Sequence, residues 1–185
     1  MTNVTATATD GDNNYGVNNS SSSPTMTDVT ATATGGTFST GVYNTGSSPS
    51  MNNVTATATD GTNNYGVYND ASPPSMNNVT ATATGGTFST GVYNSSSSPS
   101  MNNVTATATG GTSSRGVDNA ALSSPTIRNS SITGTQNSIF NSITSSAIVT
   151  NTKLDGGVEI GNGLTCANAY TITNTYNALD DTCAL

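Results

Sequence analysis

Polar and apolar residues alternate strictly in five short runs of this chain. Each run reads Thr-Ala-Thr-Ala-Thr, follows a valine and starts 25 residues after the previous run. Because a strand directs successive side chains to opposite faces, each run predicts a strand with valine and alanine inside and threonine outside. The expected outer face carries fifteen threonines: Thr5, Thr7, Thr9, Thr30, Thr32, Thr34, Thr55, Thr57, Thr59, Thr80, Thr82, Thr84, Thr105, Thr107 and Thr109.

A fixed spacing of this length is typical of a solenoid, in which every repeat forms one coil of a continuous stack. In the third repeat, Met51, Val54 and Ala56 are expected core residues, and Gly66-Val67 begins a second strand. A proline then marks the corner before the next strand, because proline cannot sit within a central strand. The pattern predicts an all-β solenoid of about seven coils.

The repeat is regular over residues 1–125 and looser over residues 126–163, where Ile132 and Leu154 take alanine positions and thicken the core. Residues 164–185 predict a C-terminal cap, because an open solenoid end exposes core and unpaired strand edges. Together, residues 1–163 are the expected solenoid. Met1 falls on the methionine position of the repeat, as expected for a mature or trimmed chain.

Composition excludes several classes of partner. Only 7% of the 185 residues are charged, against about 25% in an ordinary globular domain. The three basic residues, Arg115, Arg128 and Lys153, cannot form a phosphate-binding patch, so we expect no nucleic-acid partner. No stretch approaches the roughly 20 apolar residues of a membrane span, and no signal peptide is recognisable. Disorder also fits low hydrophobicity, but a disordered linker has no reason to keep its apolar residues in register.

Cys166 and Cys183 are the only cysteines, and the chain contains no histidine that would complete a metal site. An even pair of this kind predicts a disulfide, which would stabilise the chain by roughly 3 kcal/mol. A disulfide indicates an oxidising compartment. The alternative is two free thiols in a cytosolic protein. We expect a secreted protein without a metal or other cofactor.

The motif Ser-Pro-x-Met-Asn-Asn-Val-Thr-Ala-Thr, followed by Gly-Val-Tyr-Asn, resembles the repeats of right-handed parallel β-helix proteins secreted or displayed by bacteria. This resemblance implies a right-handed parallel β-helix of bacterial origin, and it specifies architecture rather than activity. The threonine runs also resemble the ice-binding faces of β-solenoid antifreeze proteins, which are ranks of Thr-x-Thr. Insect members of that group have shorter coils and many disulfides, so the resemblance concerns the surface and implies convergence.

The geometry of the runs favours an ice-binding role for the fifteen threonines. Alternate residues of a strand lie roughly 6.6–6.8 Å apart and neighbouring coils roughly 4.7–4.9 Å apart, a mesh similar to water spacings on some ice planes. Threonine is also stiff at χ1, so little side-chain entropy is lost on binding. The simpler interpretation is that threonine suits an exposed strand. Such faces usually mix several polar residues, and here all fifteen positions are threonine.

The hypothesis is therefore a monomeric antifreeze protein that binds ice. Two other classes of function are also open. One is a structural or adhesive module of a surface or fibre protein, in which Tyr43, Tyr68 and Tyr93 could stack on carbohydrate or simply on one another. The other is an enzyme, which we do not expect, because the aspartates lie in separate turns and no histidine exists. Asp10-Gly-Asp12-Asn-Asn14 resembles a calcium loop, but Tyr15 stands where such a loop needs glycine, which favours a turn.

Four glycosylation sequons, at Asn3, Asn53, Asn78 and Asn103, precede threonine runs. Glycans at these positions would cover the threonine face. A functional face therefore implies a bacterial source or secretion without glycosylation.

Overall fold

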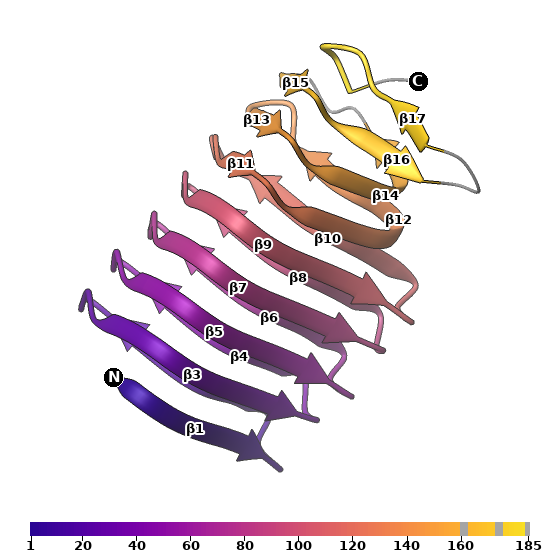
Figure 1. Ribbon diagram of the computed structural model, residues 1–185. Helices are drawn as coiled ribbons and strands as arrows, with labels where there is room; N and C mark the ends of the chain where they lie inside the picture. The colour runs from indigo at the N-terminus through magenta and orange to yellow at the C-terminus, as the bar shows by residue number, and fades with distance from the viewer. Residues whose placement is uncertain (160–162, 173–175, 184–185) are drawn as a thin grey trace.

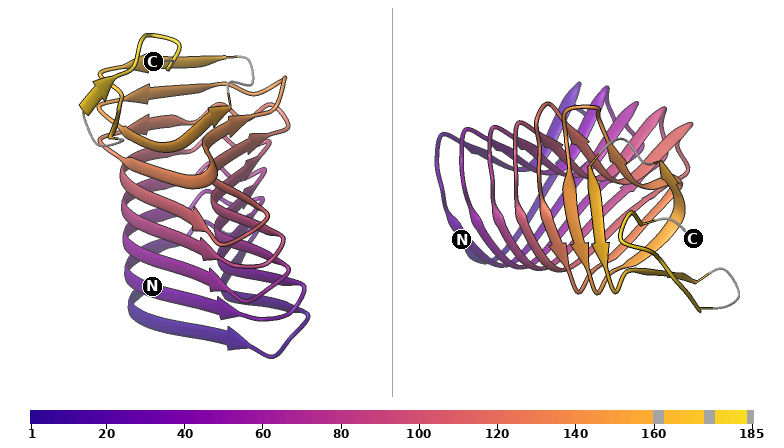
Figure 2. Two further views of the ribbon diagram at one scale, coloured as in Figure 1. Left: turned by 90° about the vertical axis from the view of Figure 1, so that its right-hand side faces the viewer. Right: turned by 90° about the horizontal axis from the view of Figure 1, so that it is seen from above.

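The computed structural model describes residues 1–159, 163–172 and 176–183, which form a parallel β-solenoid of about six turns (Figure 1). The all-β parallel fold and the 25-residue spacing are confirmed. The coils stack along one axis, and the two termini lie at opposite ends of the stack (Figure 2). The described residues include no helix that is long and apolar enough to cross a membrane.

Each of the first five coils contributes two strands, and each strand pairs in parallel with its counterpart in the next coil. The strands that carry the threonine runs are β1 (Thr2–Thr9), β3 (Thr25–Thr34), β5 (Ser50–Thr59), β7 (Ser75–Thr84) and β9 (Ser100–Thr109). The second strands of these coils are β2 (Asn13–Ser20), β4 (Phe38–Thr45), β6 (Asn63–Asp70), β8 (Phe88–Ser95) and β10 (Ser113–Ala120).

The C-terminal part of the stack is less regular, with register shifts between β12 and β14. Its strands are β11 (Thr126–Arg128), β12 (Ser131–Asn141), β13 (Ala147–Thr150), β14 (Lys153–Glu159), β15 (Leu164–Ala167), β16 (Tyr170–Ile172) and β17 (Tyr176–Ala178). The expected number of coils, about seven, is slightly too high. The reason is that β17 pairs antiparallel to β16, so the chain folds back on itself instead of winding another full turn.

The core is thin, and each inward-facing position of the repeat is filled by the same type of residue in successive coils. Met26, Met51, Met76 and Met101 stack in a fully buried column, and the alanines of β3, β5, β7 and β9 have no exposed surface. Ile127 and Val149 continue the methionine column. Burial of these columns is the main favourable contribution to folding.

Glycines in the second strands let the two sheets approach very closely. A β-carbon placed on Gly66 of β6 would lie 2.7 Å from the Thr82 nitrogen and 2.8 Å from the Ala81 carbonyl carbon of β7. Gly41 lies equally close to the backbone of Ala56 and Thr57. Because real β-carbons do not come this near to backbone atoms, only glycine fits at these positions. The coil is therefore flattened where the backbone of one sheet lies directly on the other.

A buried column of asparagines holds neighbouring coils in register. The side-chain amide of each asparagine donates to the side-chain oxygen of the next over 2.8–2.9 Å, along Asn19, Asn44, Asn69, Asn94, Asn119 and Asn141. Buried polar groups need partners, and the adjacent coil supplies one for each amide of the column as far as Asn119, while the Asn141 amide nitrogen has none. A shift of one coil against the next would break the bond between those two coils.

Strands β15, β16 and β17 lie at the C-terminal end of the solenoid, where Cys166 of β15 is disulfide-bonded to Cys183. The predicted disulfide is confirmed, and both cysteines are buried. The described part of the predicted cap thus consists of these three strands and residues 179–183. A backbone bond from the Cys166 nitrogen to the Asp181 oxygen, 2.8 Å long, reinforces the same contact.

We expect the double substitution Cys166→Ala and Cys183→Ala to lower the free energy of unfolding by roughly 3 kcal/mol, because the bond closes a loop of 17 residues. Urea denaturation followed by circular dichroism measures this change. Wild-type protein in dithiothreitol should match the variant, and dithiothreitol should leave the variant unchanged. A wild-type midpoint that does not respond to reductant would contradict the prediction.

Candidate functional site

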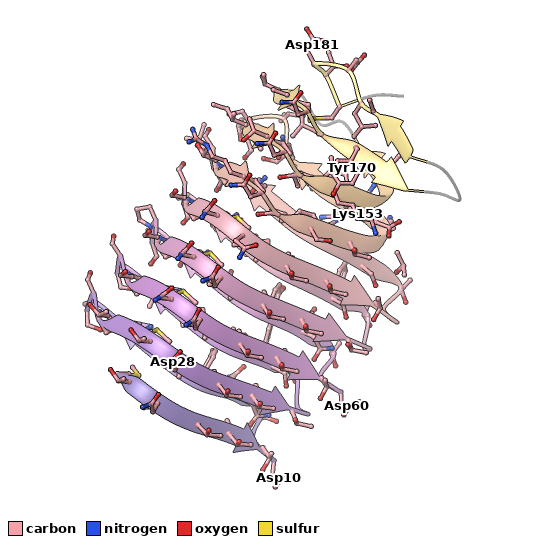
Figure 3. The ribbon with its side chains drawn as sticks, viewed as in Figure 1. Asp10, Asp28, Asp60, Lys153, Tyr170 and Asp181 are labelled. Carbon is pink, nitrogen blue, oxygen red and sulfur yellow. A yellow bond between two sulfur atoms is a disulfide. The ribbon has the colours of Figure 1, made fainter. Side chains whose placement is uncertain are left out.

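The threonine face is the outer side of β1, β3, β5, β7 and β9. The strands are paired residue by residue, so that Thr55 lies between Thr30 and Thr80, and Thr57 lies between Thr32 and Thr82. The fifteen threonines therefore form three columns of five, which run along the solenoid axis. Figure 3 shows these strands from the front, with short side chains repeated from coil to coil between the labelled Asp28 and Asp60.

The threonines point away from the core and the alanines point into it. None of the fifteen threonines is buried: the first column is exposed throughout, and the second and third columns are exposed or half-buried. The alanines of β3 to β9 are inaccessible to solvent. Each threonine thus presents both a methyl group and a hydroxyl group to solvent, at a position fixed by the paired backbone beneath it.

The hydroxyl columns continue one coil further than the threonine runs. Ser131 pairs with Thr105, and Thr133 pairs with Thr107. In the next coil the same two columns are occupied by Lys153 and Asp155, whose side chains form an ion pair of 3.1 Å. The charge-free columns therefore end at β14. The alignment of Leu154 with the alanine positions implies the same boundary, because Lys153 and Asp155 flank it.

The long edges of the threonine face are held by local structure. Asp10 and Asp60 follow the third column with positive φ angles, and Gly35 and Gly85 take the same conformation in the alternate coils. Within the third column, Thr34 and Thr59 lie on neighbouring coils, and their hydroxyl oxygens are 3.4 Å apart. Asp10 and Asp60 stand at this edge, and the exposed Asp28 stands at the opposite edge, where it accepts from the Asn53 amide. The three threonine columns themselves contain no charged residue from β1 to β9.

At the opposite edge, exposed asparagines form two further columns. The Asn78 amide donates to the Asn53 side-chain oxygen over 3.1 Å, and the Asn102 amide donates to the Asn77 side-chain oxygen over 2.9 Å. Asn53, Asn78 and Asn103 are sequon residues with φ angles of 53–54°. These amide nitrogens are used to join coils, which fixes the edge of the threonine face.

The outer side of β2, β4, β6 and β8 carries aromatic residues and is called the aromatic face below. Tyr43, Tyr68 and Tyr93 stack with ring centroids 5.2 and 4.7 Å apart, as one of the two sequence interpretations expected. Tyr15 joins Tyr43 at 5.0 Å, and Tyr65 meets Tyr68 edge-on at 5.0 Å. The sequence did not predict the Tyr15–Tyr43 and Tyr65–Tyr68 contacts, because each joins residues that occupy different positions of the 25-residue repeat.

The Tyr65 and Tyr68 hydroxyls of the aromatic face resist ionisation because their pKa values are raised. Burial, followed by the proximity of Tyr93 and Asp118, raises the pKa of Tyr65 to about 12. Burial is also the main cause of the raised pKa of Tyr68, with Tyr93 and Tyr65 adding to it. These side chains are therefore neutral hydrogen-bonding groups at physiological pH.

In the part of the chain that the structure describes, no three acidic, cysteine or histidine residues come together in a group that could hold a metal ion. Asp118 is buried in an ion pair of 2.7 Å with Arg115, whose guanidinium lies 3.7 Å from the Phe140 ring centre. Burial raises the pKa of Asp118, and the hydrogen bond from Arg115 opposes that change.

The calcium-like segment at Asp10–Asn14 is a turn. The Asn14 side-chain oxygen accepts from the Gly11 nitrogen over 3.0 Å, and its amide donates to the Gly11 and Thr34 carbonyls. Asn64 makes the same bonds with Gly61 two coils later. The asparagine thus closes the turn with its own side chain, which is the function that turn residues of this type usually serve.

No family model and no curated protein matches the sequence. Among solved structures, the chain is similar to pectate lyase Pel9A, with a TM-score of 0.51 and 13% sequence identity. The chain has a β-helix fold. The alignment covers 97% of this chain and 54% of the lyase, so the chain spans about half the length of that protein. At this identity the likeness concerns the fold alone.

Proposed function

We propose that this protein is an ice-binding (antifreeze) protein that adsorbs to ice through the threonine face and inhibits ice growth or recrystallisation. The observation that carries the proposal is the set of three threonine columns, in register over five coils and free of charge. Each methyl group discourages bulk-like hydration, and each hydroxyl anchors one ordered water.

Rigidity supports the same proposal. The threonine backbone is paired on both sides in β3, β5 and β7, and the buried asparagine column resists slippage between coils. A surface that is already ordered loses little entropy when it binds an ordered partner. Water molecules held at the spacing of the columns would therefore need little rearrangement to join an ice lattice.

The proposed protein acts as a monomer by adsorption, without catalysis and without a cofactor. The disulfide suits an oxidising compartment, and we propose secretion by a bacterium. Glycans on Asn53, Asn78 or Asn103 would cover an edge of the threonine face and break the asparagine contacts there. Secretion without glycosylation is therefore part of the proposal.

A second candidate function is a structural or adhesive solenoid module of a surface or fibre protein. The observation that favours it is the uniform stacking of coils, which makes a stiff spacer whatever residues cover its faces. The two candidates differ in one respect: a spacer gives no reason for three uninterrupted columns of threonine.

The deciding experiment is nanolitre osmometry on the purified wild-type protein, with recrystallisation of polycrystalline ice measured in parallel. We expect faceted crystals and a gap between the melting and growth temperatures. Protein unfolded by heat in dithiothreitol should lose both effects. Round, unshaped crystals in the presence of correctly folded protein would refute ice binding and leave the spacer function.

A further inference from the structure

Large apolar side chains are exposed on the aromatic face, on the sheet opposite the threonine face. Phe38 is 40% exposed and Phe88 is 50% exposed. Around them lie the half-buried rings of Tyr15, Tyr43 and Tyr65. Solubility gives no reason to expose phenylalanine, and a contiguous aromatic surface usually marks a binding site. Proposed ice binding makes no use of this face.

The aromatic face contains a shallow pocket of about 200 Å³ over the first three coils. Its lining combines flat rings with short hydrogen-bonding groups: Asn13, Tyr15, Phe38, Thr40, Tyr43, Tyr65 and Tyr68. Pockets for drug-sized molecules measure roughly 300–1,000 Å³, so this one has room for a single ring-sized group. The ligand must offer apolar ring faces and polar edges together.

The absence of charge in the lining further restricts the class of ligand that the pocket can bind. The pocket lining contains no acidic or basic side chain, and the raised pKa values of Tyr65 and Tyr68 keep their hydroxyls protonated. Fifty residues later, the equivalents of Tyr65 and Tyr68 are Arg115 and Asp118, which form an ion pair. The lining of the pocket in the first three coils is therefore uncharged, unlike the equivalent surface of the fifth coil, and it favours a neutral ligand.

We infer that this pocket binds one neutral sugar unit, presented by an oligosaccharide chain. A pyranose ring has an apolar C–H face that can lie on Phe38 or Tyr65, and its hydroxyls can bond with the Asn13 amide and the tyrosine hydroxyls. A carboxylated sugar would enter a site with no cation to pair with it, which selects against acidic glycans.

The repeat itself supplies substitutions that fold safely. Phe38 pairs with Asn13 in the preceding coil and with Asn63 in the following coil. Tyr65 likewise pairs with Thr40 and Thr90 in its two neighbouring coils. The double variant Phe38→Asn/Tyr65→Thr therefore removes two walls of the pocket with residues that this solenoid already accommodates. The matched control is Phe88→Asn, which removes an equally exposed ring outside the pocket.

Maltohexaose, cellohexaose and mannohexaose serve as neutral probes, and hexagalacturonate serves as the acidic comparison. The chain contains no tryptophan, and five of its seven tyrosines belong to β2, β4, β6 and β8, so tyrosine fluorescence reports mainly on the aromatic face, and calorimetry gives the Kd. We expect at least one neutral hexasaccharide to bind with a Kd at or below about 1 mM. The double variant should weaken that binding at least tenfold, whereas Phe88→Asn should change it less than twofold.

Three outcomes would overturn the inference. The first is no saturable binding of any neutral probe, and the second is equal binding by wild type and the double variant. The third is a concentration-dependent dimer, seen by sedimentation, that the double variant dissociates, because the aromatic face would then be an interface between copies. Circular dichroism confirms that each variant is folded. Both variants leave the threonine face unchanged, so ice activity is an independent measurement.

Discussion

Thr57→Lys should reduce ice-growth inhibition at least tenfold while the solenoid stays folded. Thr57 is the middle residue of the middle column, with Thr32 and Thr82 as its strand neighbours. Lysine carries a strongly hydrated ammonium on a flexible four-carbon stem. That group would stand above the surrounding methyl groups and hold bulk-like water against the face. The effect on binding should extend beyond one residue, because the contact is with a continuous surface.

The matched control is Thr62→Lys, which places the same charge in the same coil but in the turn after β5. Thr62 is exposed, and its backbone bonds to Gly36 and Thr87 do not involve the side chain. We expect Thr62→Lys to retain wild-type ice activity and both variants to unfold at similar denaturant concentrations. If Thr57→Lys shapes ice as the wild type does, the threonine face is not the ice-binding surface.

The alternation of threonine and alanine was sufficient to predict the two sides of the first sheet. Its period of two residues and the 25-residue spacing fix which residues are stacked, so the sequence alone places Thr55 and Thr80 as neighbours. The parallel strands follow from that stacking. Whether the columns bind ice is a separate matter, which neither the pattern nor the fold decides.

Other features depend on contacts between levels of the coil, which a repeat pattern does not reveal. The direction of the buried asparagine column follows from the orientation of each amide, and the approach of Gly66 to Thr82 follows from the fold of a whole coil. The ion pair between Lys153 and Asp155 depends on how their two side chains extend, although Leu154 at an alanine position already implies that both residues lie on the threonine columns. The aromatic pocket likewise joins Tyr15 and Tyr43 from different levels of neighbouring coils.

The close contact between the two sheets links the stability of the core to the geometry of the threonine face. Gly66 is needed for space, because a β-carbon there would meet the Gly91 oxygen at 2.6 Å as well as the backbone of Ala81 and Thr82. Ala81 is fully buried, and Thr82 next to it belongs to the middle column. Any displacement of this backbone therefore moves the outer surface.

Gly66→Ala should consequently lower the free energy of unfolding by about 1–3 kcal/mol, the usual cost of overpacking. The gain from a stiffer unfolded chain, about 0.4–1 kcal/mol, is too small to offset a clash with backbone atoms. Urea denaturation measures the change in stability. If the displaced backbone carries Thr82 with it, ice-growth inhibition should fall as well, at temperatures where the variant is still folded.

Gly85→Asn is the matched control for this prediction, since a β-carbon placed there would have no neighbour closer than the Asp60 nitrogen at 4.0 Å. The φ angle of Gly85 is 83°, and the repeat places Asp60, with a φ angle of 60°, at the same position in the preceding coil. Asparagine tolerates this conformation, so the control should differ from wild type by less than about 0.5 kcal/mol. Equal stability of Gly66→Ala and Gly85→Asn would show that the two sheets can separate without cost, and the flattened core would then not be what positions the threonine columns.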